Sequence, residues 1–185
     1  MKRNKLFGVM ALALSMMFVI SACAVGSIAT EGNAPNDNNM TEESTFKGDA
    51  YNFRLVDTNG VSHSLEEYGG KKVYVKFWAT WCPSCLEGLE ELGELPAIAG
   101  EDIVVLTVVA PGYSGEKSSS KFIEWYEGQN LEFTVLLDEG GNTFYEYGIR
   151  AVPSSFFIDT KGNLVETRLG HVGNEEILRI FDGIM

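Results

Sequence analysis

The sequence predicts an α/β fold in which a central mixed sheet is flanked by helices. Short apolar runs alternate along the chain with amphipathic runs, a pattern that favours an α/β arrangement over an all-α or all-β one. Two of the runs, residues 73–78 and 103–109, are almost continuously apolar, as in strands that are buried on both faces. Residues 46–185 have the length of a single domain.

The expected elements follow one another from residue 51 to the C-terminus. They are a hairpin of strands at 51–56 and 61–64, a strand at 73–78, a helix at 83–98, a strand at 103–109, a helix at 118–127, a strand at 134–137, a short helix at 142–147, a hairpin of strands at 155–159 and 164–169, and a last helix at 175–184.

Turn and breaker residues justify the elements of the first half. The first two strands are joined by a turn that contains Asn59-Gly60, a pair typical of tight hairpins. The helix that follows the central strand is expected to begin at Pro83. Gly88 and Gly93 weaken this helix, because each costs up to about 1 kcal/mol relative to alanine.

The second half is justified in the same way. The strand at 103–109 is continuous and β-branched, so we expect it to be a second buried strand. Asn142 is expected to cap the short helix, and Gly148 to close it. The last two strands are joined by residues 160–163 (Thr-Lys-Gly-Asn), and Asn174 is expected to cap the last helix.

The first 22 residues have the pattern of an export signal. Lys2, Arg3 and Lys5 form a positive region, and residues 6–20 form an apolar stretch. The stretch is short for a spanning helix, although an uncleaved anchor is an alternative.

The stretch ends in residues 20–23 (Ile-Ser-Ala-Cys), which resemble the lipobox of bacterial lipoproteins. That resemblance implies that Cys23 receives a diacylglycerol group, becomes the first residue after cleavage, and anchors the protein at the outer face of a membrane. Residues 23–45 are rich in Gly, Asn, Ser, Thr and acidic residues, so we expect a flexible tether. The expected organisation is therefore a signal peptide at 1–22, a tether at 23–45 and a folded domain at 46–185.

The chain is acidic, with a net charge of −12. Cleavage before Cys23 removes three basic residues and no acidic one, which brings the net charge to −15. Nucleic acid is therefore not an expected partner.

Cys82 and Cys85 are spaced as Cys-Pro-Ser-Cys where the central strand gives way to a helix. This spacing brings two sulfurs within disulfide reach, and the N–H groups of a helix N-terminus favour a thiolate at Cys82. One alternative is half of a zinc site, but no second ligand pair is present, since Cys23 is distant and His63 and His171 stand alone. The other is an ordinary structural disulfide. We favour a redox-active pair, with no metal and no cofactor beyond the disulfide itself.

The residues around this pair resemble the thioredoxin superfamily. The resemblance is carried by residues 78–85 (Trp-Ala-Thr-Trp-Cys-Pro-Ser-Cys), by Val152-Pro153 and by residues 156–159 (Phe-Phe-Ile-Asp). The extra strand and helix before Pro153 resemble the extracytoplasmic TlpA/ResA branch. Within it, four segments resemble the thioredoxin-like domains that serve extracytoplasmic methionine sulfoxide reductases: 75–79, 106–112, 122–126 and 148–153.

The resemblance implies a site. Cys82 would be the nucleophile and Cys85 the resolving cysteine, and the Val152–Pro153 bond would be cis and face them. Trp81, Pro83, Ser84, Val152 and Pro153 would bind the partner chain, because a cis proline leaves the backbone of the preceding residue free for an extended segment.

Two residues depart from relatives of this kind. Lys76 occupies the strand position at which thioredoxin has a buried aspartate. It could be a partly buried ammonium that favours the thiolate, or a lysine that snorkels to solvent. Gly88 stands three residues beyond Cys85, where TlpA/ResA proteins commonly carry a glutamate, and this departure weighs against a role in cytochrome maturation.

The function implied by the resemblance is thiol-disulfide exchange in the reducing direction, by a membrane-anchored monomer outside the cytoplasm. No cation lies between the two cysteines, which disfavours a strong oxidant. We expect the electrons to come from a CcdA/DsbD-type membrane protein and to pass to a methionine sulfoxide reductase. The alternatives are a ResA-type reductant of apocytochrome c or a general disulfide reductase, and a non-catalytic binding lipoprotein with a structural disulfide.

Overall fold

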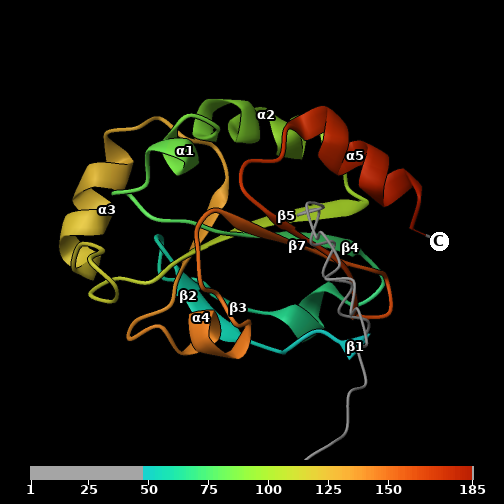
Figure 1. The fold of residues 1–185 in the computed structure, drawn as a ribbon, viewed down its shortest axis with the longest axis horizontal. Coiled ribbons are helices and arrows are strands. Elements are labelled where there is room, and N and C mark those ends of the chain that lie inside the picture. Colours follow the sequence, from blue (N-terminus) through green and yellow to red (C-terminus); the bar gives the residue numbers. More distant parts are fainter. Residues whose placement is uncertain (1–47, 185) are drawn as a thin grey trace, which may run out of the picture. The chain divides into compact units, whose positions relative to one another are not determined.

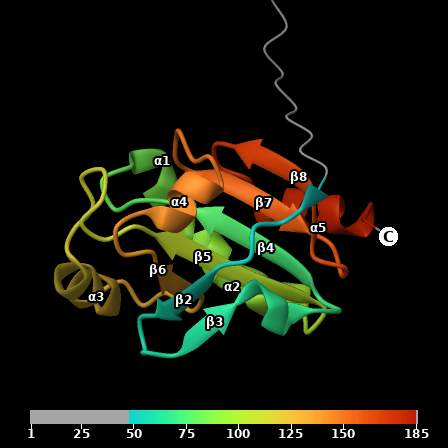
Figure 2. The ribbon, with the colours of Figure 1, turned by 90° about the horizontal axis from the view of Figure 1, so that it is seen from below.

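The computed structural model describes residues 48–184. In this part of the chain an eight-stranded sheet has the strand order β1-β8-β7-β4-β5-β6-β2-β3, and helices pack on it from both sides (Figures 1 and 2). The expected α/β fold with a mixed sheet is therefore confirmed. The expected signal peptide and tether, together with Cys23, lie outside the described residues.

The elements lie close to the ranges expected from the sequence. In chain order they are β1 (Gly48–Asp49), β2 (Arg54–Asp57), β3 (Ser62–Ser64), the 3-10 helix η1 (Leu65–Tyr68), β4 (Lys72–Phe77), α1 (Pro83–Leu86), α2 (Leu89–Ala99), β5 (Ile103–Val109), α3 (Ser119–Glu127), β6 (Thr134–Leu137), α4 (Asn142–Glu146), β7 (Ser154–Ile158), β8 (Asn163–Leu169) and α5 (Asn174–Asp182).

The centre of the sheet is formed by β4, which pairs in parallel with β5 and antiparallel with β7. The hairpin of β2 and β3 joins the sheet through antiparallel pairing of β2 with β6. Both strands expected to be buried, β4 and β5, thus occupy interior positions, and β4 leads directly to the two cysteines.

Each face of the sheet has its own hydrophobic core, because successive residues of a strand point to opposite faces. Tyr74 of β4 packs with residues of α2, α3 and α5, while Val73, Val75 and Phe77 pack on the other face with residues of η1 and α4. Cys85 belongs to the first core. The helices α1 and α2 therefore pack on the face of the sheet from which the Tyr74 side chain projects.

The single helix expected at 83–98 is wrong, since α1 and α2 are separate. Gly88 is the N-cap of α2 and has the non-helical dihedrals φ −99° and ψ 6°, so the glycine that weakens the helix interrupts it. No helix within residues 48–184 is both long and apolar enough to cross a membrane.

Both asparagine caps are also wrong by one position. Gly141 caps α4 with a φ of +75°, a conformation that glycine adopts without strain. Gly173 caps α5, and the side-chain amide of Asn174 donates instead to the backbone carbonyl of Glu91. The short strand β1 and the 3-10 helix η1 were not expected from the sequence.

Candidate active site

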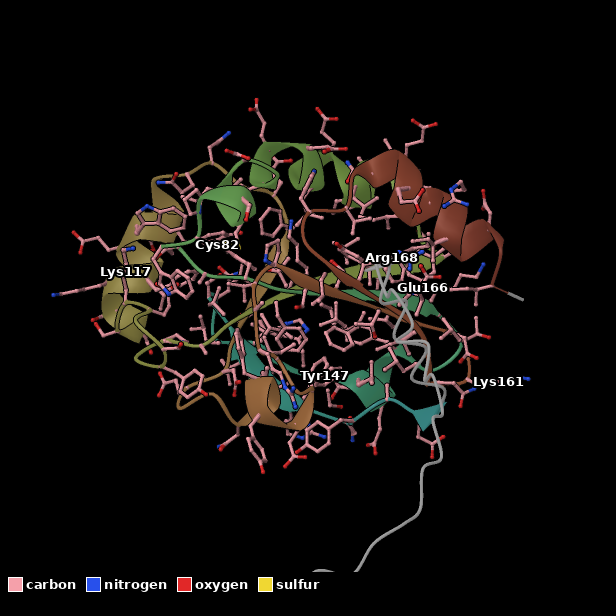
Figure 3. The ribbon with its side chains drawn as sticks, in the orientation of Figure 1. Cys82, Lys117, Tyr147, Lys161, Glu166 and Arg168 are labelled. Atoms are coloured by element: carbon pink, nitrogen blue, oxygen red, sulfur yellow. A yellow bond between two sulfur atoms is a disulfide. The ribbon has the colours of Figure 1, made fainter. Side chains whose placement is uncertain are left out.

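The two cysteines lie where β4 gives way to α1, at the end of the sheet where Figure 3 labels Cys82. Cys82 is the N-cap of α1 and Pro83 its first residue, and the backbone N–H of Cys85 donates to Cys82 Sγ over 3.3 Å. The two residues form a disulfide with their Cα atoms 5.3 Å apart. Cys85 is fully buried, whereas Cys82 keeps a small exposed fraction of 5%. A partner therefore reaches Cys82 before Cys85.

The loop that faces the disulfide contains the expected cis proline. The Val152–Pro153 bond is cis, and the carbonyl oxygen of Val152 lies 3.5 Å from Cys82 Sγ. The Ser154 hydroxyl donates to the carbonyl of Ala151 over 2.7 Å and so fixes this loop. The backbone beside Cys82 is thus placed as the sequence resemblance implied.

The residues expected to bind a partner surround Cys82. Trp81 is exposed to 52%, while Trp78 is fully buried below it. Pro83 and Ser84 are exposed, and the Ser84 hydroxyl oxygen lies 3.4 Å from Cys82 Sγ. The structure therefore brings Trp81, Pro83, Ser84, Val152 and Pro153 together around one sulfur atom.

A cavity of about 240 Å³ opens between Trp81 and the segment that precedes Pro153. Its walls are mainly apolar and aromatic, formed in part by Trp81, Tyr113 and Phe144, and the exposed Arg150 also lines it. Tyr113 packs against Gly141, where a Cβ atom would lie only 2.6 to 2.9 Å from ring atoms. The cavity has room for a side chain of a partner that flanks the reacting disulfide.

Lys76 is fully buried on β4, on the strand face that carries Tyr74. Its Nζ has no hydrogen-bond partner among the described residues. Burial lowers the pKa of Lys76 to about 8, and the charge of Glu91 opposes this shift in part. The alternative in which Lys76 snorkels to solvent is wrong, because its side chain has no exposed surface. Its influence on the thiolate stays a prediction.

The space beside Gly88 is filled by the imidazole of His171. A Cβ atom at position 88 would lie 2.2 Å from His171 Nδ1 and 2.3 Å from its Cε1. His171 Nε2 lies 3.1 Å from Glu91 Oε2, and Glu91 Oε1 accepts the backbone N–H of Asn174 over 2.7 Å. A glutamate at position 88 would therefore have to displace the ring. Sequence reasoning missed this contact, because His171 stands alone in the sequence.

A second group that sequence reasoning missed holds the turn before Cys82. The Glu116 carboxylate accepts hydrogen bonds from the Thr80 backbone N–H and from the Thr80 hydroxyl, each over 2.6 Å. The Lys117 ammonium donates to the same hydroxyl and lies 5.4 Å from the centre of the Trp125 ring. Figure 3 shows Lys117 beside α3. The loop after β5 thereby fixes Thr80, two positions before Cys82.

The site is suited to exchange between thiols and disulfides. Its two sulfur atoms can carry a pair of electrons, one sulfur is accessible and the other is shielded. Within residues 48–184, no three His, Cys, Asp or Glu side chains lie together in a way that could hold a metal ion.

Known proteins share both the sequence and the fold. A family model described as Redoxin matches residues 35–179. An uncharacterized protein from Haemophilus influenzae is 44% identical over 129 residues, which are 69% of this chain and 82% of that protein. The thiol-disulfide oxidoreductase ResA from Geobacillus kaustophilus is 30% identical over 138 residues, which are 73% of this chain and 75% of ResA.

Among solved structures, the pneumococcal exposed lipoprotein thioredoxin Etrx1 from Streptococcus pneumoniae is 41% identical. It superimposes with a TM-score of 0.69, over 72% of this chain and 100% of Etrx1. The part of the chain that matches the Redoxin model contains every residue of the site described above.

Proposed function

This chain belongs to the Redoxin family and is a thiol-disulfide oxidoreductase, and on that premise we propose that it reduces a methionine sulfoxide reductase outside the cytoplasm. The observation that carries the proposal is the Cys82–Cys85 disulfide placed opposite the cis Val152–Pro153 bond. The four segments that resemble the domains serving such reductases support this choice of partner. They include the turn around Ala110 and the loop that leads to Pro153.

In the proposed reaction the Cys82 thiolate attacks one sulfur of the partner's disulfide. A mixed disulfide forms, and the second partner sulfur leaves as a thiolate. Cys85 then attacks Cys82 Sγ, so that the Cys82–Cys85 disulfide forms and the first partner sulfur is released as a thiolate. Two electrons and, at neutral pH, two protons pass to the partner. The burial of Cys85 keeps it from competing for the partner in the first step.

The oxidised protein must then be reduced again. We propose a CcdA/DsbD-type membrane protein as the donor, because no soluble nicotinamide system operates outside the cytoplasm. Residues 20–23 resemble a lipobox, and the similar Etrx1 is described as an exposed lipoprotein. Both support a lipid anchor at Cys23, which would hold the domain beside such a donor.

A second candidate function is reduction of apocytochrome c or of exported proteins in general, and the similarity to ResA favours it. The His171 ring weighs against the reduction of apocytochrome c. It fills the space that would be needed at position 88 by the glutamate common in TlpA/ResA proteins.

The test is to express the Cys85→Ala variant in the native host, where a mixed disulfide on Cys82 cannot be resolved. Proteins attached to it are separated under non-reducing conditions and identified by mass spectrometry. We expect a methionine sulfoxide reductase and a CcdA-like membrane protein. Attached apocytochrome or a broad range of exported proteins would support the second candidate function. If the variant is well expressed and no protein is attached to it, both candidate functions are contradicted.

A further inference from the structure

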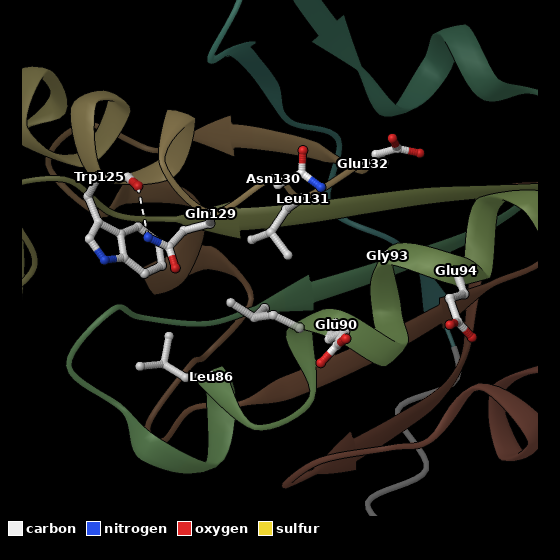
Figure 4. A pocket seen from close by; sticks show the side chains of 10 residues that line it. Leu86, Glu90, Gly93, Glu94, Trp125, Gln129, Asn130, Leu131 and Glu132 are labelled. Carbon is white, nitrogen blue, oxygen red and sulfur yellow. Dashed lines mark hydrogen bonds between the residues drawn. The ribbon is translucent and has the colours of Figure 1, made fainter.

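A groove of about 490 Å³ runs between α2 and the segment that leads from α3 to β6. Figure 4 shows α2 as one wall and residues 129–132 as the other. Its apolar surface is provided by Leu86, Leu89, Trp125 and Leu131. Leu86 directly follows Cys85 and is exposed to 38%. The groove, which we call the α2 groove, therefore begins at the redox helix without including either cysteine.

Three carboxylates stand on both walls of the α2 groove. Glu90 and Glu94 come from α2, and Glu132 comes from the opposite wall (Figure 4). All three side chains are exposed, and within residues 48–184 none of them forms an ion pair or a hydrogen bond. The described part of the chain thus supplies no positive group that pairs with them, and the nearby Lys117 is engaged with Thr80 and Trp125.

The groove is also kept open by a glycine inside α2. Gly93 lines it, and a Cβ atom at this position would meet no atom within 4 Å. A glycine inside a helix costs about 0.5 to 1 kcal/mol relative to alanine. No neighbour among residues 48–184 requires the small residue, since none of their atoms lies within 4 Å of that Cβ position. The absence of a side chain at Gly93 leaves room in the groove for a side chain of another molecule.

We propose that the α2 groove receives a segment of the redox partner in which a lysine or arginine stands next to a large apolar side chain. The apolar side chain would lie on Leu89 and Leu131, over Gly93, and the cation would pair with Glu90, Glu94 or Glu132. Opposite charges at such a rim speed the encounter and select the partner. The proposal rests on the exchange reaction at Cys82, whichever reductase is its natural substrate.

The test uses two synthetic peptides with one cysteine, activated as a mixed disulfide with thionitrobenzoate. In one peptide the cysteine is flanked on both sides by alternating leucine and lysine, and in the other by leucine and glutamate. The reduced Cys85→Ala protein attacks the peptide sulfur through Cys82, a Cys82–peptide disulfide forms, and coloured thionitrobenzoate leaves with the electron pair. We expect the basic peptide to react about tenfold faster at low salt, and less so as salt is added.

Two variants separate the groove from the general charge of the protein. Gly93→Leu fills the groove without changing charge, and Glu90→Lys with Glu94→Lys reverses its rim. Each is expected to abolish most of the preference for the basic peptide. The matched control is Glu124→Lys with Glu127→Lys, which makes the same charge change on exposed positions of α3 that do not line the groove, and it should keep most of the preference.

Three results would overturn the proposal: no preference in the parent protein, a full preference in Gly93→Leu, or an equal loss in the α3 control. The rate with dithiodipyridine, a small uncharged disulfide that needs no groove, is measured on every variant. An unchanged rate shows that the exchange chemistry at Cys82 is intact, so a failure of the groove is distinguished from a failure of the proposed function.

Discussion

The Lys76 side chain places an ammonium group in the interior of the protein, close to the face of the sheet on which Cys85 rests. It is fully buried, and no hydrogen-bond acceptor within residues 48–184 reaches its Nζ. Burial lowers its pKa to about 8, so the group is still mostly charged at pH 7. A positive charge in a medium of low dielectric constant acts strongly on nearby thiols.

Replacing Lys76 by methionine should therefore make the Cys82 thiolate scarcer. In the reduced protein, we expect the rate of alkylation by iodoacetamide at pH 7 to fall roughly threefold to tenfold, because the pKa of the reacting thiol rises. The difference should disappear above about pH 8, where Lys76 itself loses its charge. Lys71→Met, which removes an exposed lysine, is the control. Superimposable rate profiles for Lys76→Met and the parent protein would refute the electrostatic role.

The same lysine makes stability depend on pH. Its pKa is lower in the folded protein than its ordinary value of 10.5, so the unfolded chain binds the proton more tightly between about pH 8 and 10.5. Below pH 8 the buried charge destabilises the folded protein by roughly 3 kcal/mol, and this destabilisation decreases as the pH rises. Lys76→Met should therefore be more stable than the parent protein at pH 7. The difference between their free energies of unfolding should be smaller by roughly 1 kcal/mol at pH 9. Denaturant unfolding at both pH values measures this difference. The same difference at pH 7 and pH 9 would contradict the burial of a charged lysine.

At the scale of elements, the turn between β4 and α1 is held by a loop that is distant in the sequence. Glu116 accepts two hydrogen bonds from Thr80, 36 positions away, and both residues are buried. The turn that presents Cys82 is thus fixed by the loop after β5 as well as by its own helix.

Glu116→Ala should loosen this turn. It leaves the buried N–H of Thr80 without its acceptor, which costs about 1 to 3 kcal/mol. We expect a lower midpoint of denaturant unfolding and slower reduction of insulin. Glu124→Ala, at an exposed position of α3, should change the free energy of unfolding by no more than about 0.5 kcal/mol. It should leave the rate of insulin reduction unchanged. Equal stability of the two variants would show that the Thr80–Glu116 contact contributes little.

Most elements could be predicted from the sequence because their signals are local. The bounds of β5 and β6 agree with the expected 103–109 and 134–137, since continuous β-branched runs end where the strands end. The break at Gly88 could not be placed, because two weakening glycines occur in one helical pattern and only the packing of His171 distinguishes them. The Thr80–Glu116 contact could not be predicted either, since nothing in the local pattern separates Glu116 from the other acidic residues.

At the scale of the whole molecule, the proposed lipid anchor and the redox site lie in different parts of the chain. Cys23 lies in the lipobox-like segment, whereas the site is built within residues 76–153 of the described domain. The two tasks should therefore be separable by substitution.

Cys23→Ala should release the protein from the membrane without changing its chemistry. We expect the parent protein to sediment with membranes and to incorporate a labelled fatty acid in the native host, and the variant to do neither. Insulin reduction by the purified variant should equal that of the parent. Membrane association that survives the substitution would point instead to an uncleaved apolar anchor at residues 6–20.

Electron transfer from this protein to a methionine sulfoxide reductase is tested by a reconstitution with purified proteins. The reduced parent protein is mixed with the extracytoplasmic methionine sulfoxide reductase of the same organism and with free methionine sulfoxide, and both methionine and the Cys82–Cys85 disulfide are measured over time. We expect one methionine for each disulfide formed, and no methionine when Cys82→Ser replaces the parent protein. If the reductase forms no methionine while the same protein still reduces insulin, the reductase is not its electron acceptor.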